Sequence, residues 1–340
     1  IINKNIIYCE GGINIKKIIV LLMTCLLLVG CNKMDSSSSI KKYKKLLNDN
    51  SMYKLTGEMD IVSNEELYHY NVTVDYMEGE YYKASLINKD NRHEQIILKN
   101  ENGVFVVTPS LNKSFKFQSE WPYNSSQAYI LSSLLKDLEN DSNVTFEEKE
   151  DKYILGSTVN YPNNTSLISQ KITFDKDMKP ELVEVFNKEG IVNIKFKISK
   201  IDFKPEFKED NFEVENTASD NTIDNVGKID EVVYPMYLPT GTKFKSEETV
   251  KTDDTERVIL TFTGEKSFIL IEEASKVPKE FEVTSKDGEL VFYETVMGSL
   301  SGSSLNWTMN GKDYYIIGEN LSNEELLKVA SSTSIVSLTK

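Results

Sequence analysis

The chain is poor in the residues that most often carry chemistry. Its 340 residues include three cysteines and two histidines. The cysteines are Cys9, Cys25 and Cys31, so the long remainder of the chain can form no disulfide and supplies no thiol nucleophile. The histidines, His69 and His93, fall in strand-like segments, whereas a zinc site needs several ligands oriented by neighbouring hydrogen bonds. We therefore expect no metal centre and no cofactor.

Motifs for catalysis are missing as well. The sequence has no glycine-rich phosphate loop and no dinucleotide-binding fingerprint. Residues 298–302 have Leu300 at their centre, where a nucleophile elbow needs serine, so we expect a flexible Gly/Ser hairpin there. Acidic pairs such as Asp175 and Asp177 lie in turn-like stretches. A net charge of −14 without a long basic run argues against nucleic acid as a partner, and we predict that the protein is not an enzyme.

What the sequence does have is a leader. Lys16 and Lys17 precede an apolar run that ends in Leu28-Val29-Gly30-Cys31, which is typical of a bacterial lipoprotein signal. The small residue before Cys31 lets the peptidase approach, and the Cys31 thiol is then acylated. The run is shorter than the roughly 20 residues of a membrane span. We expect the mature chain to begin at Cys31, anchored by its acyl chains to the extracytoplasmic face of the cell membrane.

The rest of the chain divides by composition. The residues that precede the charged start of the leader begin with Ile, and we expect them to lie upstream of the true start. A serine-rich stretch after Cys31 is expected to be a flexible tether, and a second polar stretch without periodicity is expected to link two domains. The predicted layout is an upstream extension with signal peptide at 1–30, a lipidated tether at 31–39, a first domain at 40–215, a linker at 216–229 and a small α+β domain at 230–340.

Alternating apolar residues predict many strands in the first domain. Their short polar links imply antiparallel neighbours, because parallel strands need long crossovers. The expected strands are 53–62, 67–76, 81–87, 93–99, 103–108, 114–118, 144–148, 152–159, 168–174, 182–187 and 191–203. Helices are expected over 40–48 and, strongly apolar, over 125–139, with Ser125 or Ser126 as the cap of the second. This second helix is the expected cover for one face of the sheet.

The second domain has fewer strands and one well-marked helix. Its expected strands are 257–263, 267–273, 290–296, 304–309 and 312–317. Ser322 and Glu325 stand at the spacing of a capping box, so a helix is expected to follow Ser322. Leu326 and Leu327 begin its apolar face.

An aromatic segment stands out between residues 103 and 129, and two interpretations of it stay open. Its aromatic residues are Phe105, Phe115, Phe117, Trp121, Tyr123 and Tyr129. The first interpretation is core packing around a fixed turn. The second is a hydrophobic groove between sheet and helix that accepts an acyl chain or a partner's apolar side chain, because Trp and Tyr combine an apolar ring with a polar group. The groove residues would be Phe105, Phe115, Phe117, Trp121 and Tyr129.

The same segment resembles a known family. The run TPSLNKSFKFQSEWPYNSSQAY, preceded by ILKNENGVFVV, is similar to the LolA-like lipoproteins of spore-forming Firmicutes, the SsdC/YdcC and GerS group. The resemblance implies an α+β fold: an unclosed antiparallel β-barrel with helices plugging its concave face. Tyr234-Pro235, Trp307 and the closing helix resemble the small domain that follows LolA-like domains in many Firmicute lipoproteins. The two-domain layout also resembles the RseB/MucB regulators.

The resemblance implies a role in spore formation or germination. GerS-type proteins are binding partners of a cortex-modifying amidase, so it implies a protein partner of that kind, and a forespore or mother-cell membrane as the location. The extra C-terminal domain departs from the GerS pattern and puts the amidase in doubt. We expect a non-catalytic binding partner in sporulation, germination or cortex assembly. The alternative is a lipid or lipoprotein carrier that binds an acyl chain in the sheet–helix groove.

Overall fold

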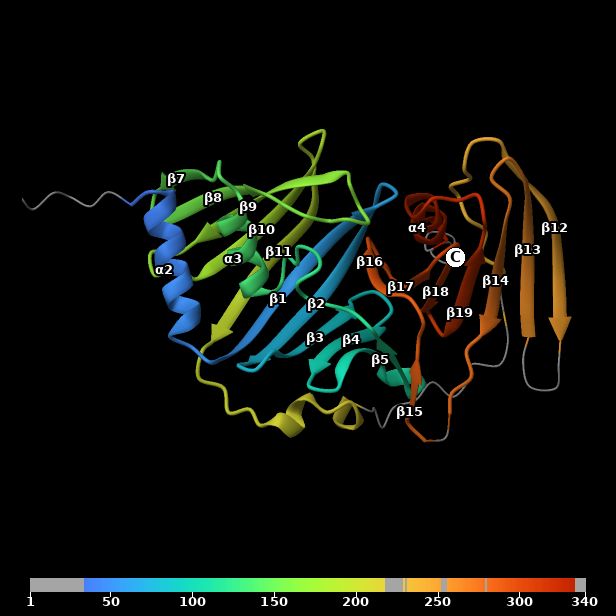
Figure 1. Cartoon of the computed structure of the whole chain (residues 1–340), viewed down its shortest axis with the longest axis horizontal. Coiled ribbons are helices and arrows are strands. Elements are labelled where there is room, and N and C mark those ends of the chain that lie inside the picture. The colour runs from blue at the N-terminus through green and yellow to red at the C-terminus, as the bar shows by residue number, and fades with distance from the viewer. Residues whose placement is uncertain (1–33, 218–228, 230, 252–255, 279, 334–340) are drawn as a thin grey trace, which may run out of the picture. The chain divides into compact units, whose positions relative to one another are not determined.

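Two antiparallel sheets and the helices packed on them make up most of the chain. The computed structural model describes residues 34–217, 229, 231–251, 256–278 and 280–333, and from Ser36 onward these form one compact unit (Figure 1). The predicted signal peptide, Cys31 and most of the predicted linker lie outside the described residues. The boundaries predicted for the two domains stay predictions.

The large sheet has twelve strands in the order β15-β6-β5-β4-β3-β2-β1-β11-β10-β9-β8-β7. All neighbours are antiparallel except β15 and β6. The sheet is open, because β15 and β7 are its two ends. Its strands are β1 (Met52–Ser63), β2 (Glu66–Met77), β3 (Tyr81–Asn88), β4 (Glu94–Asn100), β5 (Gly103–Thr108), β6 (Lys113–Phe117), β7 (Thr145–Lys149), β8 (Lys152–Thr158), β9 (Leu167–Phe174), β10 (Pro180–Asn187), β11 (Val192–Asp202) and β15 (Glu282–Ser285).

This open antiparallel sheet, with helices against it, confirms the predicted α+β class. The strands form because apolar residues alternate along them. In β1, for example, Tyr53, Leu55, Met59 and Ile61 are at most 3% exposed. We call the face of the sheet that carries these side chains the inner face.

Helices α2 (Ser36–Asn48) and α3 (Leu131–Asn140) pack together against the large sheet (Figure 1). The Tyr43 hydroxyl of α2 donates to the carbonyl oxygen of Leu131 at 3.0 Å. The Tyr43 ring packs edge-on against Phe174 of β9, with ring centroids 5.0 Å apart. Leu134 and Leu138 of α3 are buried to 1% exposure. The prediction that an apolar helix covers the sheet is confirmed.

Both helices begin at other residues than predicted. Residues 36–39 belong to α2 and Ser39 is fully buried, so they are not part of a flexible tether. Helix α3 begins six residues later than expected, and Ile130 occupies its N-cap without a side-chain bond. Ser126 does not cap it, because its hydroxyl donates to Asp137 Oδ1 at 2.8 Å. Ser125 instead accepts a bond from the Gln127 side chain at 2.8 Å.

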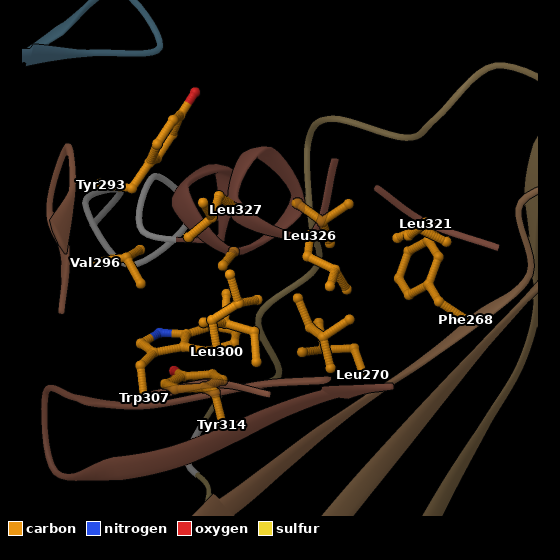
Figure 2. Close-up of a cluster of buried hydrophobic side chains, with 14 of the residues drawn as sticks. Phe268, Leu270, Tyr293, Val296, Leu300, Trp307, Tyr314, Leu321, Leu326 and Leu327 are labelled. Atoms are coloured by element: carbon orange, nitrogen blue, oxygen red, sulfur yellow. The ribbon is translucent and has the colours of Figure 1, made fainter. Parts of the chain in front are cut away.

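The small sheet has seven strands in the order β12-β13-β14-β19-β18-β17-β16. Helix α4 (Asn323–Ser332) covers one of its faces. Figure 2 shows Leu326 and Leu327 of this helix above Leu300, Trp307 and Tyr314 of the strands. The strands are β12 (Thr242–Lys251), β13 (Glu256–Gly264), β14 (Phe268–Ala274), β16 (Glu289–Tyr293), β17 (Val296–Ser301), β18 (Ser304–Met309) and β19 (Lys312–Ile317).

The predicted capping box of α4 is confirmed. The Ser322 hydroxyl accepts from the backbone N–H of Glu325 at 3.2 Å, and the Glu325 carboxylate accepts from the backbone N–H of Ser322 at 2.9 Å. These bonds satisfy two groups that the first turn of a helix leaves unpaired.

Three strands were not predicted. In β12 and β15 most residues are exposed, so their sequences show no clear alternation of apolar and polar residues. β17 includes Gly298, so the predicted flexible hairpin at 298–302 is wrong for its first part, and the turn itself lies at Gly302 and Ser303. A Cβ on Gly298 would lie 2.3 Å from the carbonyl oxygen of Asn306. Glycine therefore allows β17 and β18 to approach closely.

Candidate functional site

The inner face of the large sheet is the surface on which the sequence predicted a groove. Helix α3 covers one part of it. Strands and turns of the small sheet cover another part, through bonds from Gln95 to the carbonyl oxygen of Thr308 at 3.4 Å and from Ser63 to Glu294 at 2.6 Å. The inner face is therefore largely filled by the chain's own residues.

The structure distributes the five predicted groove residues over separate places. Phe105 is 5% exposed on the outer face, in a cluster with Leu98 and Val214. Trp121 and Tyr129 are each 3% exposed, and the Trp121 ring lies 5.9 Å from that of Tyr82. These three side chains pack in the interior. Their predicted role in binding, like that of Phe115 and Phe117, stays a prediction.

Phe115 and Phe117 line a cavity of about 210 Å³ between β6 and β15 on one side and β17, β18 and β19 on the other. Lys113 and Asp313 form an ion pair across it at 2.8 Å. Lys286 Nζ lies 4.7 Å above the Phe115 ring, and burial lowers the pKa of Lys286. Ligand pockets span roughly 300–1,000 Å³, so this cavity is small for a ligand and belongs to the packing between the sheets.

A larger cavity, of about 660 Å³, opens where β2, β3 and β4 meet two turns of the small sheet. We call it the mouth groove. Its volume falls within the range of ligand pockets. It is lined by Glu66, Leu67, Tyr68, Tyr70, Leu86, Asn88, Asp90, Asn91, Arg92, His93, Gln95, Ser110, Thr295, Met309 and Asn310.

The mouth groove combines an apolar wall with a polar end. Tyr68 and Leu86 form part of the wall, and Leu67, 49% exposed, extends it to solvent. At the polar end, Asn91 donates to Asn310 of the small sheet at 2.8 Å. Such a site suits an apolar side chain or chain segment that carries a polar group at one end.

Charge in the mouth groove comes from Arg92 and Asp90 of the loop before β4 and from Glu66 of β2. Arg92 forms no ion pair with any described residue. Burial lowers the pKa of His93 to about 4, so its ring is neutral near pH 7, and its Nε2 has no hydrogen-bond partner among the described residues. Arg92 thus gives the groove a cation that a carboxylate of a ligand or partner could meet.

Helix α3 is held over the inner face by a buried polar network. Asp137 accepts from Ser126 at 2.8 Å and from Gln170 of β9 at 3.1 Å. Gln170 also donates to Ser157 of β8 at 3.1 Å. Burial raises the pKa of Asp137 to about 6, although the hydrogen bonds from Ser126 and Gln170 act in the opposite direction. The network attaches the helix to two distant strands.

The remaining candidates for chemistry are scattered. His69 Nδ1 lies 2.6 Å from Asp60 Oδ1 on the neighbouring strand β1, as expected of a strand residue. Within the described ranges no three His, Cys, Asp or Glu side chains gather as a metal site. No helix in the described part of the chain has the length and apolar character needed to cross a bilayer.

Comparison with known proteins identifies the family. The chain is 38% identical over 328 residues to the sporulation protein YdcC of Bacillus subtilis strain 168, a match that covers 94% of this chain and 97% of the relative. The chain belongs to the YdcC family. This confirms the resemblance that the aromatic segment indicated. No family model matches the chain.

Solved structures resemble the chain more distantly. The MucA/MucB complex of Pseudomonas aeruginosa matches with a TM-score of 0.33 and 11% identity, over 87% of this chain and 98% of that one. The LolA superfamily protein NE2245 of Nitrosomonas europaea matches with a TM-score of 0.30 and 11% identity, over 54% and 99%.

The mouth groove was missed at the sequence level. One signal for it was available: Tyr68 and Tyr70 alternate in β2, and so point to the same face. The other wall comes from turns near Thr295 and Asn310, more than 200 residues further along the chain. No local pattern connects the two.

Proposed function

We propose that this member of the YdcC family is a lipoprotein that acts in sporulation by docking a protein partner at the extracytoplasmic face of the membrane, anchored by acylated Cys31. The observation that carries the proposal is the 38% identity to a sporulation protein over almost the whole of both chains. A match of that length includes both sheets, and therefore the residues from both that line the mouth groove.

The docking site in this proposal is the mouth groove. Its volume and apolar wall suit a partner's apolar side chain, and Arg92 suits an acidic group beside it. Among the described residues that line the groove, Arg92 is the one cation, against the two carboxylates of Glu66 and Asp90. A cortex-modifying amidase stays the prediction for the partner's identity. The predicted lack of catalysis also stays a prediction.

Two matched variants test the docking site. Leu67→Glu places a charge on the groove wall, whereas Ile191→Glu places the same charge on an aliphatic side chain that is 59% exposed outside the groove. The tagged full chain is crosslinked in sporulating membranes and its partners are identified by mass. We expect Leu67→Glu to lose the specific partner and Ile191→Glu to retain it. Equal recovery from both variants would remove the groove from the proposal.

The anchor is tested separately. Intact-mass analysis of the membrane-extracted protein should show a chain that starts at Cys31 and carries acyl groups. A Cys31→Ser variant should keep its leader and lack the added mass. An unmodified Cys31 in the wild-type chain would contradict the proposed anchoring and leave the docking proposal to stand on its own test.

A second candidate function is the binding of an acyl chain in the same groove. The observation that favours it is the apolar wall formed by Tyr68, Tyr70, Leu86 and Met309. Native mass spectrometry of the full chain, extracted with a detergent that is removed in the gas phase, would show a bound lipid. Loss of that lipid in Leu67→Glu but not in Ile191→Glu would place it in the groove.

A further inference from the structure

Helix α2 is the element that lies closest in sequence to the proposed anchor. Four residues stand between Cys31 and Ser36, the first residue of the helix. A chain spans at most about 3.6 Å per residue, so this connection reaches at most about 18 Å. A chain held in the membrane at Cys31 therefore keeps the start of α2 close to the bilayer surface.

The solvent-facing side of α2 is basic. It consists of Ser37, Ser38, Lys41, Lys45 and Asn48, which are all exposed and lie on one side of the helix. We call it the lysine face. None of the 13 residues of α2 is acidic. Lys41 and Lys45 stand one turn apart, and neither forms an ion pair with any described residue.

The other two lysines of α2 are bound to the chain itself. Lys44 pairs with Glu139 of α3 at 2.9 Å, and Lys42 donates to the carbonyl oxygen of Lys176. Carboxylates lie at the ends of the helix and along its flanks: Asp35, Asp49, Glu139, Glu148, Asp175 and Asp177. Of these, Glu148 is paired with Lys176 at 2.6 Å. The lysine face itself presents two unpaired ammonium groups and no carboxylate, in a chain whose net charge is −14.

The opposite side of α2 is already occupied by the protein. Ser39 and Tyr43 are fully buried, and Tyr43 bonds to Leu131 and packs against Phe174. A helix that inserts into the interface of a bilayer needs a free apolar face, and α2 has none. Contact between α2 and a membrane is therefore made by the lysine face with the headgroups, and its strength depends on charge.

We infer that the lysine face of α2 lies on the anionic phospholipid headgroups of the membrane that holds the chain. This deepens the proposed function and rests on its anchor at Cys31. Lysines within a Debye length of an anionic surface, about 8–10 Å, are attracted to it, and the short connection to Cys31 holds α2 near that surface. The chain as a whole is acidic, so the same membrane repels its other faces. Attraction at one face and repulsion at the others select one orientation.

This orientation points the mouth groove away from the membrane. Helix α2 ends at Asn48, and β1 starts from the same end of the large sheet at Met52. β1 ends at Ser63, which bonds to Glu294 of the small sheet, and Leu67 of the mouth groove follows closely. Figure 1 shows α2 at one end of these strands and the small sheet at the other. A strand of 12 residues spans about 40 Å, so the groove is clear of the lipid and open to a partner.

Pulse labelling of lysines tests the contact. The acylated full chain is reconstituted into vesicles of phosphatidylcholine, either alone or mixed with phosphatidylglycerol, and treated briefly with an amine-reactive reagent. Mass spectrometry then quantifies each lysine. Lys243 and Lys245 are the internal references, because both are exposed on β12 of the small sheet. Relative to them, we expect Lys41 and Lys45 to label several-fold more slowly with phosphatidylglycerol than without it, and high salt to remove the difference.

Two matched double variants test whether the charge of the lysine face is the cause. Lys41→Gln/Lys45→Gln removes two charges from the lysine face, and Lys243→Gln/Lys245→Gln removes two from β12. All four positions are exposed, so both chains should fold, which circular dichroism checks. Lys44 of α2, 52% exposed, reports on both variants. We expect its protection by phosphatidylglycerol to disappear in the first variant and to remain in the second.

Equal labelling of Lys41 and Lys45 in the two kinds of vesicle would overturn the inference. So would slow labelling of both in detergent without vesicles, because another part of this chain would then cover the helix. Intact mass and flotation of the same sample show whether Cys31 is acylated and the chain anchored. An acylated, floating chain without the labelling difference rejects the membrane contact of α2 and leaves the proposed anchor and docking site standing. A chain without acyl groups rejects the anchor, and the inference with it.

Discussion

Helices α3 and α4 have ten residues each and cover a sheet each, yet they are attached by different means. α4 starts at a capping box that involves only Ser322 and Glu325, three residues apart. α3 starts without a side-chain cap. Its first turn is fixed by Ser133, whose hydroxyl accepts from the backbone N–H of Gln127 at 2.8 Å, and its later residue Asp137 is bound by Gln170 of β9.

The buried carboxylates of Asp137 and Glu272 also differ in their partners. Asp137 lies among neutral donors, and burial raises its pKa to about 6. Glu272 of β14 is fully buried, but Lys312 of β19 forms an ion pair with it and the backbone N–H of Val233 donates to it at 3.0 Å. The start of α4 is therefore fixed by neighbouring residues of its own sequence, whereas α3 depends on bonds to distant strands through the buried Asp137.

The largest expected effect comes from breaking the buried charge pair between β14 and β19. Lys312→Met should lower the free energy of unfolding by about 3–5 kcal/mol, because it leaves the buried Glu272 carboxylate without its cation. Urea unfolding monitored by tryptophan fluorescence measures this. Lys251→Met is the control: it removes a surface ion pair with Glu256 whose lysine is 71% exposed, and should cost less than about 1 kcal/mol. Equal losses would mean that the Glu272 site is hydrated.

Next in size are the apolar contacts of the two helices. Leu134→Ala in α3 and Leu327→Ala in α4 should each cost about 2–5 kcal/mol, because both side chains are at most 1% exposed. Leu135→Ala in α3, at a half-buried position, should cost distinctly less. Thermal unfolding compares the three variants. If Leu134→Ala were nearly neutral, the inner face beneath α3 would be an open groove, and the acyl-binding alternative would gain support.

Asp137 should make stability depend on pH. Its pKa is about 6 in the folded chain, against about 3.9 in an unfolded one. The folded state therefore holds the proton more tightly, and stability should fall as pH rises from about 4 to 6, by on the order of 2–3 kcal/mol. In Asp137→Asn this fall should be absent, since Gln170 can turn its amide to accept from the new donor. A parallel pH profile for both chains would show that Asp137 is charged and solvated.

The smallest effect concerns the cap of α4. Ser322→Ala should cost about 0.5–2 kcal/mol, because Glu325 loses the hydroxyl that accepts its backbone N–H. Glu324→Gln, in the first turn of the same helix, removes only a surface ion pair with Lys328. It should cost about 0.5 kcal/mol or less. Chemical denaturation of both variants measures the difference. If the two costs are the same, the capping box adds nothing to the stability of α4.

Sequence patterns predicted most of the fold because most of it is locally encoded. The alternation in β1 and the capping box at Ser322 each involve neighbours in the chain, and both were predicted to within a residue or two. The start of α3 was not predicted correctly, because Ser126 bonds to Asp137 and Asn160 instead of capping the helix. β15 was missed because its exposed residues have no alternation, and only its pairing with β6 makes it a strand.

The candidate site was less predictable than the fold. The aromatic composition of residues 103–129 suggested a groove. Composition alone does not show which face of the sheet each ring lies on, or which part of the chain covers that face. Phe105 and Phe115 lie on opposite faces of the same sheet. The mouth groove needs β2 and the turn at Asn310 to be neighbours, and that follows only from the way the two sheets pack.

The pairing of β15 with β6 sets an order of events during synthesis. Lys113 of β6 has emerged from the ribosome long before Glu282, its neighbour on β15, has been translated. Until then the outer hydrogen-bonding edge of β6 is bare, and a bare strand edge recruits other strands. The edge of β6 is therefore open to pairing with other molecules until β15 has been made. A chain that stops before residue 282 would have this unpaired edge permanently.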